Sequence, residues 1–397
     1  MQNVAVTIFA LSACVVVYTI IGYPLILWLR TLMHRPETAP VAGAPRTVTV
    51  LLAVHNGEAW IAGKLHSLLA LDYPRDLLRI LVLDDGSTDD TPRLVRALRD
   101  PRVELVSLPR GGKARTLNAG LALAHSEILF FTDVRQTLHP QSLRRLVARF
   151  DDPSVGVASG ELVIQAVDRQ EEVVGLYWRY EKWIRRHQSV LDAMTGATGA
   201  IYAMRRELVP PLPADMLVDD MYLPLSAWLK GHRVVFEPDA KAYDCGTTPR
   251  EEFRRKVRTL AGNIQIVRAL PGLLSGSLRP RFDFVSHKMS RLILPWAVLL
   301  VGLSSLLLPA PARGVLIAAQ AACYALAALD VVIPASSGMK GLTASPHTFV
   351  VLLIAAAWAT PLALVGQGAS WRPSTIGCGR PAAMRAGRLL RTIRVAR

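Results

Sequence analysis

Cysteine is scarce in this sequence, and its few copies are not spaced for a metal site. The 397 residues include 4 cysteines. They are Cys14, Cys245, Cys323 and Cys378, and two of them fall within long apolar runs. A disulfide framework is therefore disfavoured, and so is a metal cluster built on paired cysteines.

Charged residues are also few, at 19% of the chain against 51% hydrophobic residues. Four runs are almost free of charge: residues 4–29, 292–308, 314–333 and 349–365. The first is about 26 residues long and the others about 17 to 20, near the ~20 that cross a bilayer. Residues 4–29 lack the basic start and the cleavage site of a secretory signal. Because three later runs in series leave no polar face for water, we predict three membrane segments after an N-terminal anchor.

Acidic residues are outnumbered, 31 against 46 lysines and arginines, which gives a net charge of +15. The surplus gathers in residues 250–291 and in the tail. Nucleic-acid binding is one explanation, but the position beside apolar runs favours attraction to anionic membrane lipids. We therefore expect membrane lipids as partners and no nucleic acid.

Basic residues also predict the orientation of the chain in the membrane. They follow the first apolar run and precede the second, so residues 30–291 are expected on the cytoplasmic side of the plasma (inner) membrane. If all three later runs cross, the basic tail lies outside. Either one late run lies in the interface or re-enters, or the rule fails here, and the sequence leaves this open.

These features divide the chain into five parts. We predict a transmembrane anchor at 1–33, an α/β domain at 46–248 and basic interfacial helices at 249–291. Transmembrane segments at 292–366 and a basic tail at 367–397 follow. A Pro- and Ala-rich linker at 36–45 separates the anchor from the domain.

The soluble region alternates short apolar runs with helical patterns. Strands are expected at 48–54, 80–83, 103–108, 128–132 and 155–164. Helices are expected at 60–71, 91–98, 113–124, 170–190 and 220–229, with a basic amphipathic stretch at 250–270 suited to the membrane surface. The alternation predicts an α/β fold with a doubly wound, mostly parallel sheet.

Carboxylates follow two of these strands. Asp84 and Asp85 end one, and Asp133 ends another. Each could be a turn or capping residue. Because ligands bind beyond the carboxyl ends of parallel strands, the coincidence favours one shared crevice. Asp133 also suits a magnesium or manganese ion that bridges a diphosphate.

Two predicted helices begin with residues that could bind phosphate or accept a proton. Gly111 and Gly112 precede Lys113, where glycines allow close approach and a helix N-terminus attracts phosphate. Asp219 and Asp220 begin another helix. Either could be a cap, but a helix N-terminus also keeps Asp220 ionised and able to act as a general base.

The ordered motifs together resemble family 2 glycosyltransferases, in particular the membrane branch of cellulose, hyaluronan and poly-N-acetylglucosamine synthases. The resemblance covers roughly residues 48–308. It rests on six motifs: Val54-His55-Asn56-Gly57-Glu58, Asp84-Asp85-Gly86-Ser87-Thr88-Asp89, Gly112-Lys113-Ala114, Asp133-Val134-Arg135-Gln136, Asp219-Asp220 and Arg255-Lys256-Val257-Arg258.

The resemblance implies a GT-A-type, Rossmann-like fold and inverting transfer of a hexosyl or N-acetylhexosaminyl group from a nucleotide sugar, first of all a UDP-sugar. Asp85, with Asp84 beside it, would contact the nucleotide base, and Glu58 would lie near the same pocket. Lys113 and Arg258 would meet the diphosphate. The resemblance makes Asp133 the ligand of Mg²⁺ or Mn²⁺, and Asp220 the catalytic base.

The sequence departs from the family at three places. Arg135 replaces the second metal-binding acid, so it could meet phosphates or acceptor itself. Asp219 replaces a glutamate before the base. Thr259 replaces the tryptophan that stacks on the acceptor sugar, a role that Trp178 or Trp183 could take over. Thr198 and Gly199 resemble an acceptor-side loop.

Three functions remain open at this point. The first is extension of an exopolysaccharide or capsule-type polymer, with partner subunits of an export system. The second is a single transfer to polyprenyl phosphate or another lipid-linked acceptor. The third, of another class, is a non-catalytic membrane scaffold that binds nucleotide sugars.

Overall fold

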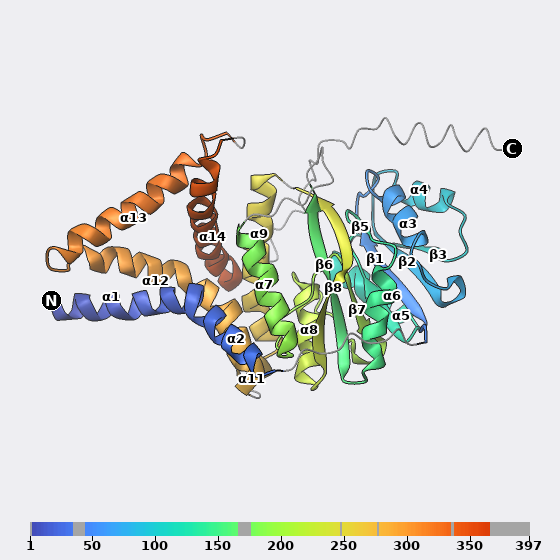
Figure 1. Ribbon diagram of the computed structural model, residues 1–397. Coiled ribbons are helices and arrows are strands. Elements are labelled where there is room, and N and C mark those ends of the chain that lie inside the picture. Colours follow the sequence, from blue (N-terminus) through green and yellow to red (C-terminus); the bar gives the residue numbers. More distant parts are fainter. Residues whose placement is uncertain are drawn as a thin grey trace.

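A computed structural model describes residues 2–34, 44–165, 176–246, 248–275, 278–334 and 337–365. It consists of an α/β domain and a group of long helices that projects from one side of it (Figure 1). Most of the predicted linker and the whole basic tail lie outside the described residues, as does the start of the helix predicted at 170–190.

One eight-stranded sheet forms the centre of the domain, in the order β3-β2-β1-β4-β7-β6-β8-β5. The strands are β1 (Val48–Val54), β2 (Leu78–Asp85), β3 (Val103–Leu108), β4 (Ile128–Phe131), β5 (Thr137–Leu138), β6 (Val155–Gln165), β7 (Tyr202–Arg205) and β8 (Arg233–Cys245). The first four pair in parallel, whereas β7 runs antiparallel to both β4 and β6. The α/β sheet is confirmed, in the mixed form typical of GT-A folds.

Helices cover both faces of the sheet, so the domain has three layers. They are α3 (Ile61–Leu69), α4 (Thr91–Ala97), α5 (Lys113–Leu123), α6 (Ser142–Ala148), α7 (Leu176–Val190) and α8 (Asp219–Leu229). One apolar cluster joins α5, α7 and α8 to the sheet, and the other joins α3 and α6 to its opposite face. β1 is buried along almost its whole length, as its continuous apolar run predicts.

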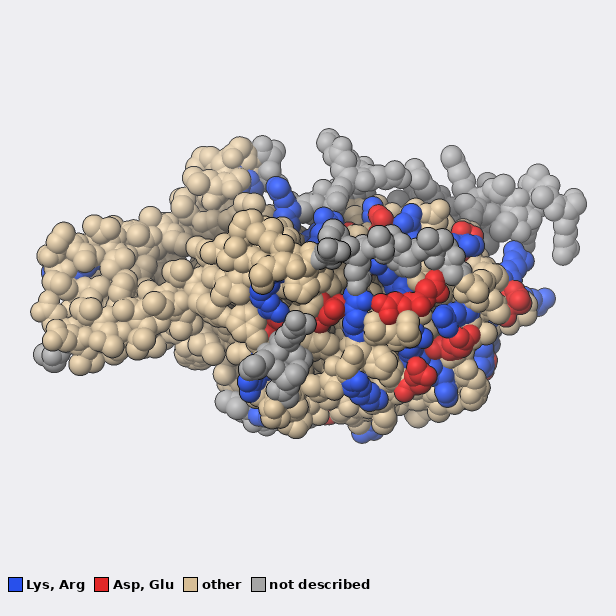
Figure 2. All heavy atoms as spheres, turned by 60° about the horizontal axis from the view of Figure 1, so that its bottom comes forward, with Lys and Arg blue, Asp and Glu red and all other residues tan. Residues whose placement is uncertain are grey.

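Four stretches of helix are long and apolar enough to cross a membrane: Gln2–Leu32, Arg281–Ser305, Ala312–Leu329 and Lys340–Leu362. They consist of α1 (Gln2–Val17), η1 (Tyr18–Gly22), α2 (Tyr23–Leu32), α11 (Leu278–Phe284), η5 (Val285–Met289), α12 (Ser290–Ser305), α13 (Ala312–Leu329) and α14 (Lys340–Val365). In Figure 2 lysine, arginine and acidic side chains gather over the α/β domain and are nearly missing from the projecting helices. The separation fits helices that face lipid.

The first and second spans enter the core of the α/β domain. Tyr23 and Leu27 of α2 and Phe284 of α11 are fully buried in the same apolar cluster as β4 and α8. Arg30 forms a bidentate ion pair with the buried Asp283, at 2.8 and 3.1 Å. Because side chains of both candidate spans complete this cluster, we expect the orientation of the domain relative to these two helices to be fixed.

The basic amphipathic stretch forms α9 (Pro249–Ala269), which short α10 (Gly272–Ser275) follows. Thr248 and Glu251 form a capping box at its start. Its apolar residues Val257 and Ala261 pack against Ala355 and Ala359 of α14. The candidate span α14 therefore covers this part of the surface, which we expected to lie on the bilayer.

Helix α14 begins nine residues before the predicted run at 349–365. Asp330, at the end of α13, explains the difference, because Lys340 lies 2.9 Å from it and Thr343 donates a hydrogen bond to it at 2.7 Å. In Figure 1 α14 runs across the direction of α1 and α12 instead of alongside them, and it packs on α9 beside the domain. This geometry favours the interfacial or re-entrant alternative for the last segment.

We predict that the connection between α13 and α14 faces the same side of the membrane as the α/β domain. Gly338 in this connection and Gly314 near the start of α13 both have open space for a side chain. In a chain whose native cysteines are replaced by alanine, Gly338→Cys should react with a membrane-impermeant maleimide from the domain side, and Gly314→Cys from the other. A variant that keeps only the exposed Cys245 marks the domain side. Labelling of both new cysteines from one side would contradict this arrangement.

Candidate active site

A single lysine contacts acids from two distant parts of the chain, at the carboxyl end of the central strand β4. Lys113 opens α5, and its Nζ lies 3.0 Å from Asp133 Oδ1 and 3.0 Å from Asp219 Oδ1. Burial opposes its charge, but Asp133, Asp219 and Asp220 outweigh this and raise the pKa of Lys113. Asp133 at the end of β4 and Asp219 at the start of α8 therefore meet around one ammonium group.

Asp220 lies in this group, and the pKa of its carboxyl is raised above the ordinary value. Burial, the neighbouring Asp219 and the charge of Asp133 raise its pKa to about 6, against the opposing charges of Lys113 and Arg258. A carboxylate of this pKa is mostly ionised at neutral pH and is a stronger base than an ordinary aspartate. The arrangement suits proton abstraction.

The loop that contains Thr198 and Gly199 lies against Asp220. A β-carbon on Gly199 would lie 2.8 Å from Asp220 Oδ2, so the loop approaches the carboxylate as closely as only glycine allows. The Ala197 N–H also donates to the Asp220 carbonyl at 2.8 Å. The predicted acceptor-side loop and the predicted base are thus in contact.

Asp133 supplies one carboxylate at which a cation could bind. Burial would raise its pKa, but the Lys113 ammonium outweighs burial and lowers it, so Asp133 is ionised. Arg135, where the family has a second acid, donates to Asp244, which Gln136 Nε2 also contacts at 2.8 Å. Among the described residues no group of three His, Cys, Asp or Glu side chains could hold a metal ion. The site therefore fits a divalent cation held by Asp133 and by phosphate oxygens of a substrate.

The buried Lys64 holds residues on both sides of Asp133. It is 1% exposed, and its Nζ donates to Thr132 Oγ1 at 2.6 Å and to the Gln136 carbonyl at 2.8 Å, one on each side of Asp133. Burial lowers the pKa of Lys64 to about 7. Our sequence reading missed it, although Lys64 stands with Ile61, Leu65 and Leu68 on the apolar face of its helix, which is an unusual place for a lysine.

Asp85 shapes the loop that leads to Lys113. Its carboxylate accepts from the N–H groups of Gly111 at 2.7 Å and Gly112 at 3.0 Å, and from the Arg110 side chain. Gly112 has φ +89°, and Gly86 has φ +62° with Arg110 N only 2.8 Å from where a β-carbon would lie. These glycines are required by the backbone. A contact of Asp85 with a nucleotide base remains a prediction.

Glu58 and Asp84 hold the neighbouring turns. The Glu58 carboxylate accepts from the Asp90 N–H at 3.1 Å, its own N–H donates to Asp89 at 3.0 Å, and Asp84 accepts from the Ser87 N–H at 3.1 Å. These contacts tie the loops after β1 and β2 together. Such hydrogen bonds within turns are the structural role that the sequence left open as the alternative to ligand binding.

Comparison with known proteins identifies the domain. Residues 49–210 match the model of the glycosyl transferase family 2. This region is a family 2 glycosyltransferase domain. It contains the loops of Asp85, Lys113 and Asp133, whereas Asp220 and Arg258 lie beyond it.

Two relatives match part of the chain. The chain is 34% identical over 122 residues to the succinoglycan biosynthesis protein ExoO of Rhizobium meliloti, which is 30% of this chain and 34% of that one. It is also 34% identical over 140 residues to the beta-monoglucosyldiacylglycerol synthase of Synechocystis, which is 32% of this chain and 29% of that one. The chain thus spans about a third of the length of these relatives.

A solved structure resembles nearly the whole chain. The mannosyltransferase of Pyrobaculum calidifontis, solved in complex with GDP-Man and Mn²⁺, superposes with a TM-score of 0.71 at 23% identity. The match covers 90% of this chain and 99% of that one. The resemblance therefore extends from the family 2 domain into the long helices, as a likeness of fold.

Helix α9 carries Arg258 to the family 2 domain from outside the matched region. The charge of Arg258 acts on both acids: it adds to the lowering of the pKa of Asp133 and opposes the rise in the pKa of Asp220. Beside it, Lys256 lies 4.5 Å from the ring centre of Tyr177, which joins α9 to α7. Trp178, by contrast, packs against the apolar cluster on the α3 and α6 face. Its stacking on an acceptor remains a prediction.

Helix α9 also positions the segment that precedes the base. A β-carbon on Gly262 would lie 2.6 Å from Val218 Cγ2, and Gln265 accepts from the Leu217 N–H at 3.0 Å. We predict that Gly262→Ala pushes Val218 and with it Asp220 away from Lys113. Turnover should fall about tenfold to a hundredfold, because small misplacements are costly in catalysis. Donor KM should change little.

Gly272→Ala is a matched control for this prediction, because a β-carbon there meets only ordinary contacts at 3.6 Å. Steady-state kinetics of both variants separate the two readouts. An equal loss in both, or a loss confined to donor KM, would contradict a positioning role for α9.

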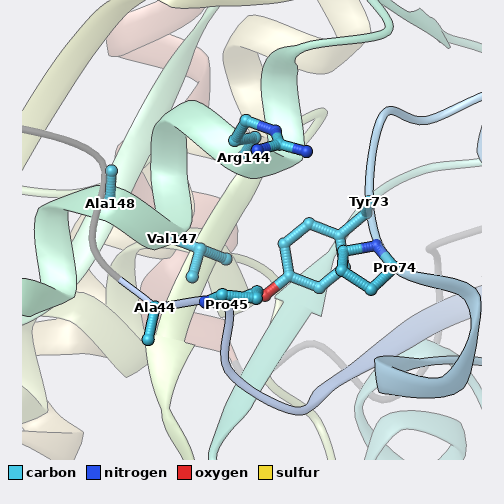
Figure 3. Close-up of a pocket in the computed structure, with 7 residues that line it drawn as sticks. All are labelled: Ala44, Pro45, Tyr73, Pro74, Arg144, Val147 and Ala148. Atoms are coloured by element: carbon cyan, nitrogen blue, oxygen red, sulfur yellow. The ribbon is translucent and has the colours of Figure 1, made fainter.

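A small pocket elsewhere on the domain does not take part in this chemistry. Figure 3 shows its lining by Tyr73, Pro74, Arg144 and Val147, with the chain before β1 closing one side. Its volume is about 30 Å³, whereas ligand pockets usually measure about 300–1,000 Å³. A nucleotide sugar does not fit there.

Proposed function

We propose that this chain is a membrane-bound inverting glycosyltransferase that moves a sugar from a nucleotide-sugar donor, first of all a UDP-sugar, to a saccharide acceptor. The observation that carries the proposal is the Lys113 ammonium, 3.0 Å from both Asp133 and Asp219, beside a carboxyl of raised pKa at Asp220. The Lys113 ammonium supplies the positive charge that diphosphate binding needs. The Asp220 carboxylate supplies the base that activation of an acceptor hydroxyl needs.

Each residue has one role in the proposed transfer. Lys113 and Arg258 stabilise the negative charge of the departing nucleoside diphosphate. Asp133 would hold a divalent cation, which, when bound, neutralises further phosphate charge. Asp220 accepts the proton of the acceptor hydroxyl as its oxygen bonds to the anomeric carbon and the carbon–diphosphate bond breaks. One displacement inverts the configuration, and no carboxylate is needed as a nucleophile.

The membrane sets where this occurs. Buried side chains of α2 and α11 complete the core of the domain, which supports a catalytic site held next to the bilayer. Following the basic residues that flank the spans, we place this site on the cytoplasmic face of the plasma membrane.

The acceptor has two candidates. One is the end of a growing exopolysaccharide, together with partner subunits for export, in line with the succinoglycan relative. The other is a single addition to a lipid-linked acceptor, in line with the glycolipid synthase. Thr259 favours the second, because the aromatic platform that would hold a polymer end after Arg258 is missing at that position. Product sizing separates them: a ladder of lengths supports the polymer, and one added sugar supports the lipid-linked acceptor.

The direct test is to incubate purified membranes with a panel of UDP- and GDP-sugars, with and without Mg²⁺ or Mn²⁺. We expect one donor to be consumed and its sugar to appear in a lipid-linked or polymeric product. Membranes with the Asp220→Asn variant are the control. Binding of a donor without any transfer by the unmodified chain would favour a non-catalytic scaffold instead.

A further inference from the structure

Three cationic side chains gather where the second span enters the α/β domain. Lys288 lies on η5 and Arg291 on α12, both in the stretch Arg281–Ser305, and Arg185 lies on α7. Arg185 donates to Thr198 Oγ1 at 2.9 Å, in the loop whose Gly199 contacts Asp220. His287, the neighbour of Lys288 on η5, has its Nδ1 3.1 Å from Gln188 Nε2 of α7, the helix that carries Arg185. The cations therefore lie where α7 packs against the second candidate span, and Arg185 contacts the loop beside the proposed base.

Among the described residues, Arg291 is the one of these three cations that forms an ion pair with an acid. Glu181, 8% exposed, accepts from Arg291 at 2.6 Å and lies 3.9 Å from His287 Nε2. Within the part of the chain that the structure describes, the half-buried Lys288 ammonium makes no hydrogen bond or ion pair, and Arg185 contacts only a neutral hydroxyl.

Such an arrangement calls for an anionic ligand. Leaving cations partly buried without a counter-charge costs free energy, which an anion recovers. A guanidinium and an ammonium together are the usual partners of a phosphate. On α12 the exposed Ile293 and Trp296 continue from the cations toward the apolar end of the span. A ligand with a phosphate at one end and a hydrocarbon chain at the other matches both features.

We propose that Lys288 and Arg185 bind the phosphate of a lipid-linked saccharide acceptor. This rests on the proposed transferase function and names its acceptor class. The phosphate anchors the acceptor at the cations, and a sugar hydroxyl beyond it reaches Asp220. That hydroxyl loses its proton to Asp220, its oxygen bonds to the anomeric carbon of the donor, and the nucleoside diphosphate leaves.

The test measures binding of radiolabelled farnesyl phosphate to the purified full chain in detergent. Lys288→Gln and Arg185→Gln should each weaken binding about tenfold or more, because a charge-assisted contact is lost. Arg179→Gln, an exposed arginine on the same helix, is the matched control and should bind as the unmodified chain does. Lys288→Gln carries the test if Arg185→Gln disturbs the Thr198 loop.

Competitors distinguish the sources of the phosphate. Unlabelled farnesyl phosphate should displace the probe, whereas inorganic phosphate and farnesol should do so at least about tenfold less well. Equal competition by inorganic phosphate would overturn a lipid acceptor, and equal competition by farnesol would overturn a phosphate site. UDP and GDP binding is measured on the same samples to tell two failures apart. If the unmodified chain binds nucleotide but not farnesyl phosphate, or if both variants bind farnesyl phosphate as the unmodified chain does, this inference alone is overturned. If the unmodified chain binds no nucleotide, the proposed transferase function is overturned.

Discussion

Asp220→Asn is expected to lower sugar transfer by about 10² to 10⁴-fold, the usual contribution of a general base. The asparagine keeps the shape of the side chain but cannot accept the proton of the acceptor hydroxyl. Donor binding should change little, because Lys113 retains Asp133 and Asp219 as partners at 3.0 Å. Transfer to the acceptor and nucleotide binding, measured separately on one preparation, check both halves of this expectation.

The same variant should not be less stable than the unmodified chain. The pKa of Asp220 is raised above its ordinary value, so its ionised form is less favourable in the folded protein than in the unfolded one. At neutral pH a neutral side chain removes repulsion by Asp219 and Asp133. The melting temperature should therefore stay the same or rise. The exposed Asp215→Asn is a matched control that should leave transfer unchanged, and turnover retained by Asp220→Asn would favour the scaffold.

The pH profile offers a further check on the same residue. With a pKa of about 6 for Asp220, transfer at limiting donor should halve near pH 6 and fall about tenfold per unit below it. The proton-accepting form is lost as the pH falls, so the loss is on the acid side. Asp220→Asn should abolish this acid limb in whatever activity remains.

The first half of the sheet could be predicted almost residue by residue. Runs expected at 48–54, 103–108 and 128–132 correspond to β1, β3 and β4, because buried parallel strands are continuously apolar and end in turn residues. Two strands were not predicted: β7, which runs antiparallel to its neighbours, and β8, which pairs in parallel with β6. In β8, Pro238 and Asp239 interrupt the apolar pattern, and the pairing with β6 accommodates them through an irregularity at Gly160 and Glu161.

The acids of the site were found, but their partners were not. Strand ends located Asp85 and Asp133, since the sheet brings such positions to one edge. Lys64, Arg110 and Asp244 reach the site from separate elements, and only tertiary packing shows which charge each one meets. Arg135 illustrates the limit: its type suggested contact with phosphate, whereas the structure pairs it with Asp244.

Asp133→Ala is the second change with a large expected effect. The resemblance to family 2 matches Asp133 with the first acid of the metal-binding pair, and Arg135 occupies the position of the second. Its removal should weaken nucleotide binding in the presence of Mg²⁺ or Mn²⁺ about tenfold or more, the worth of a charge-assisted contact of about 1.5–3 kcal/mol. Without the metal, binding should fall much less, or even rise, because Lys113 loses a competing partner.

Calorimetric titration of UDP and GDP with and without Mn²⁺ measures this difference directly. The exposed Asp76→Ala serves as the control for removal of one negative charge, and it should leave both titrations unchanged. A metal that bridges Asp133 and the diphosphate predicts a coupling between the two ligands that the Asp133 variant lacks. If the variant kept the full effect of Mn²⁺ on nucleotide binding, the cation would be held by the diphosphate alone, and Asp133 would serve only to position Lys113.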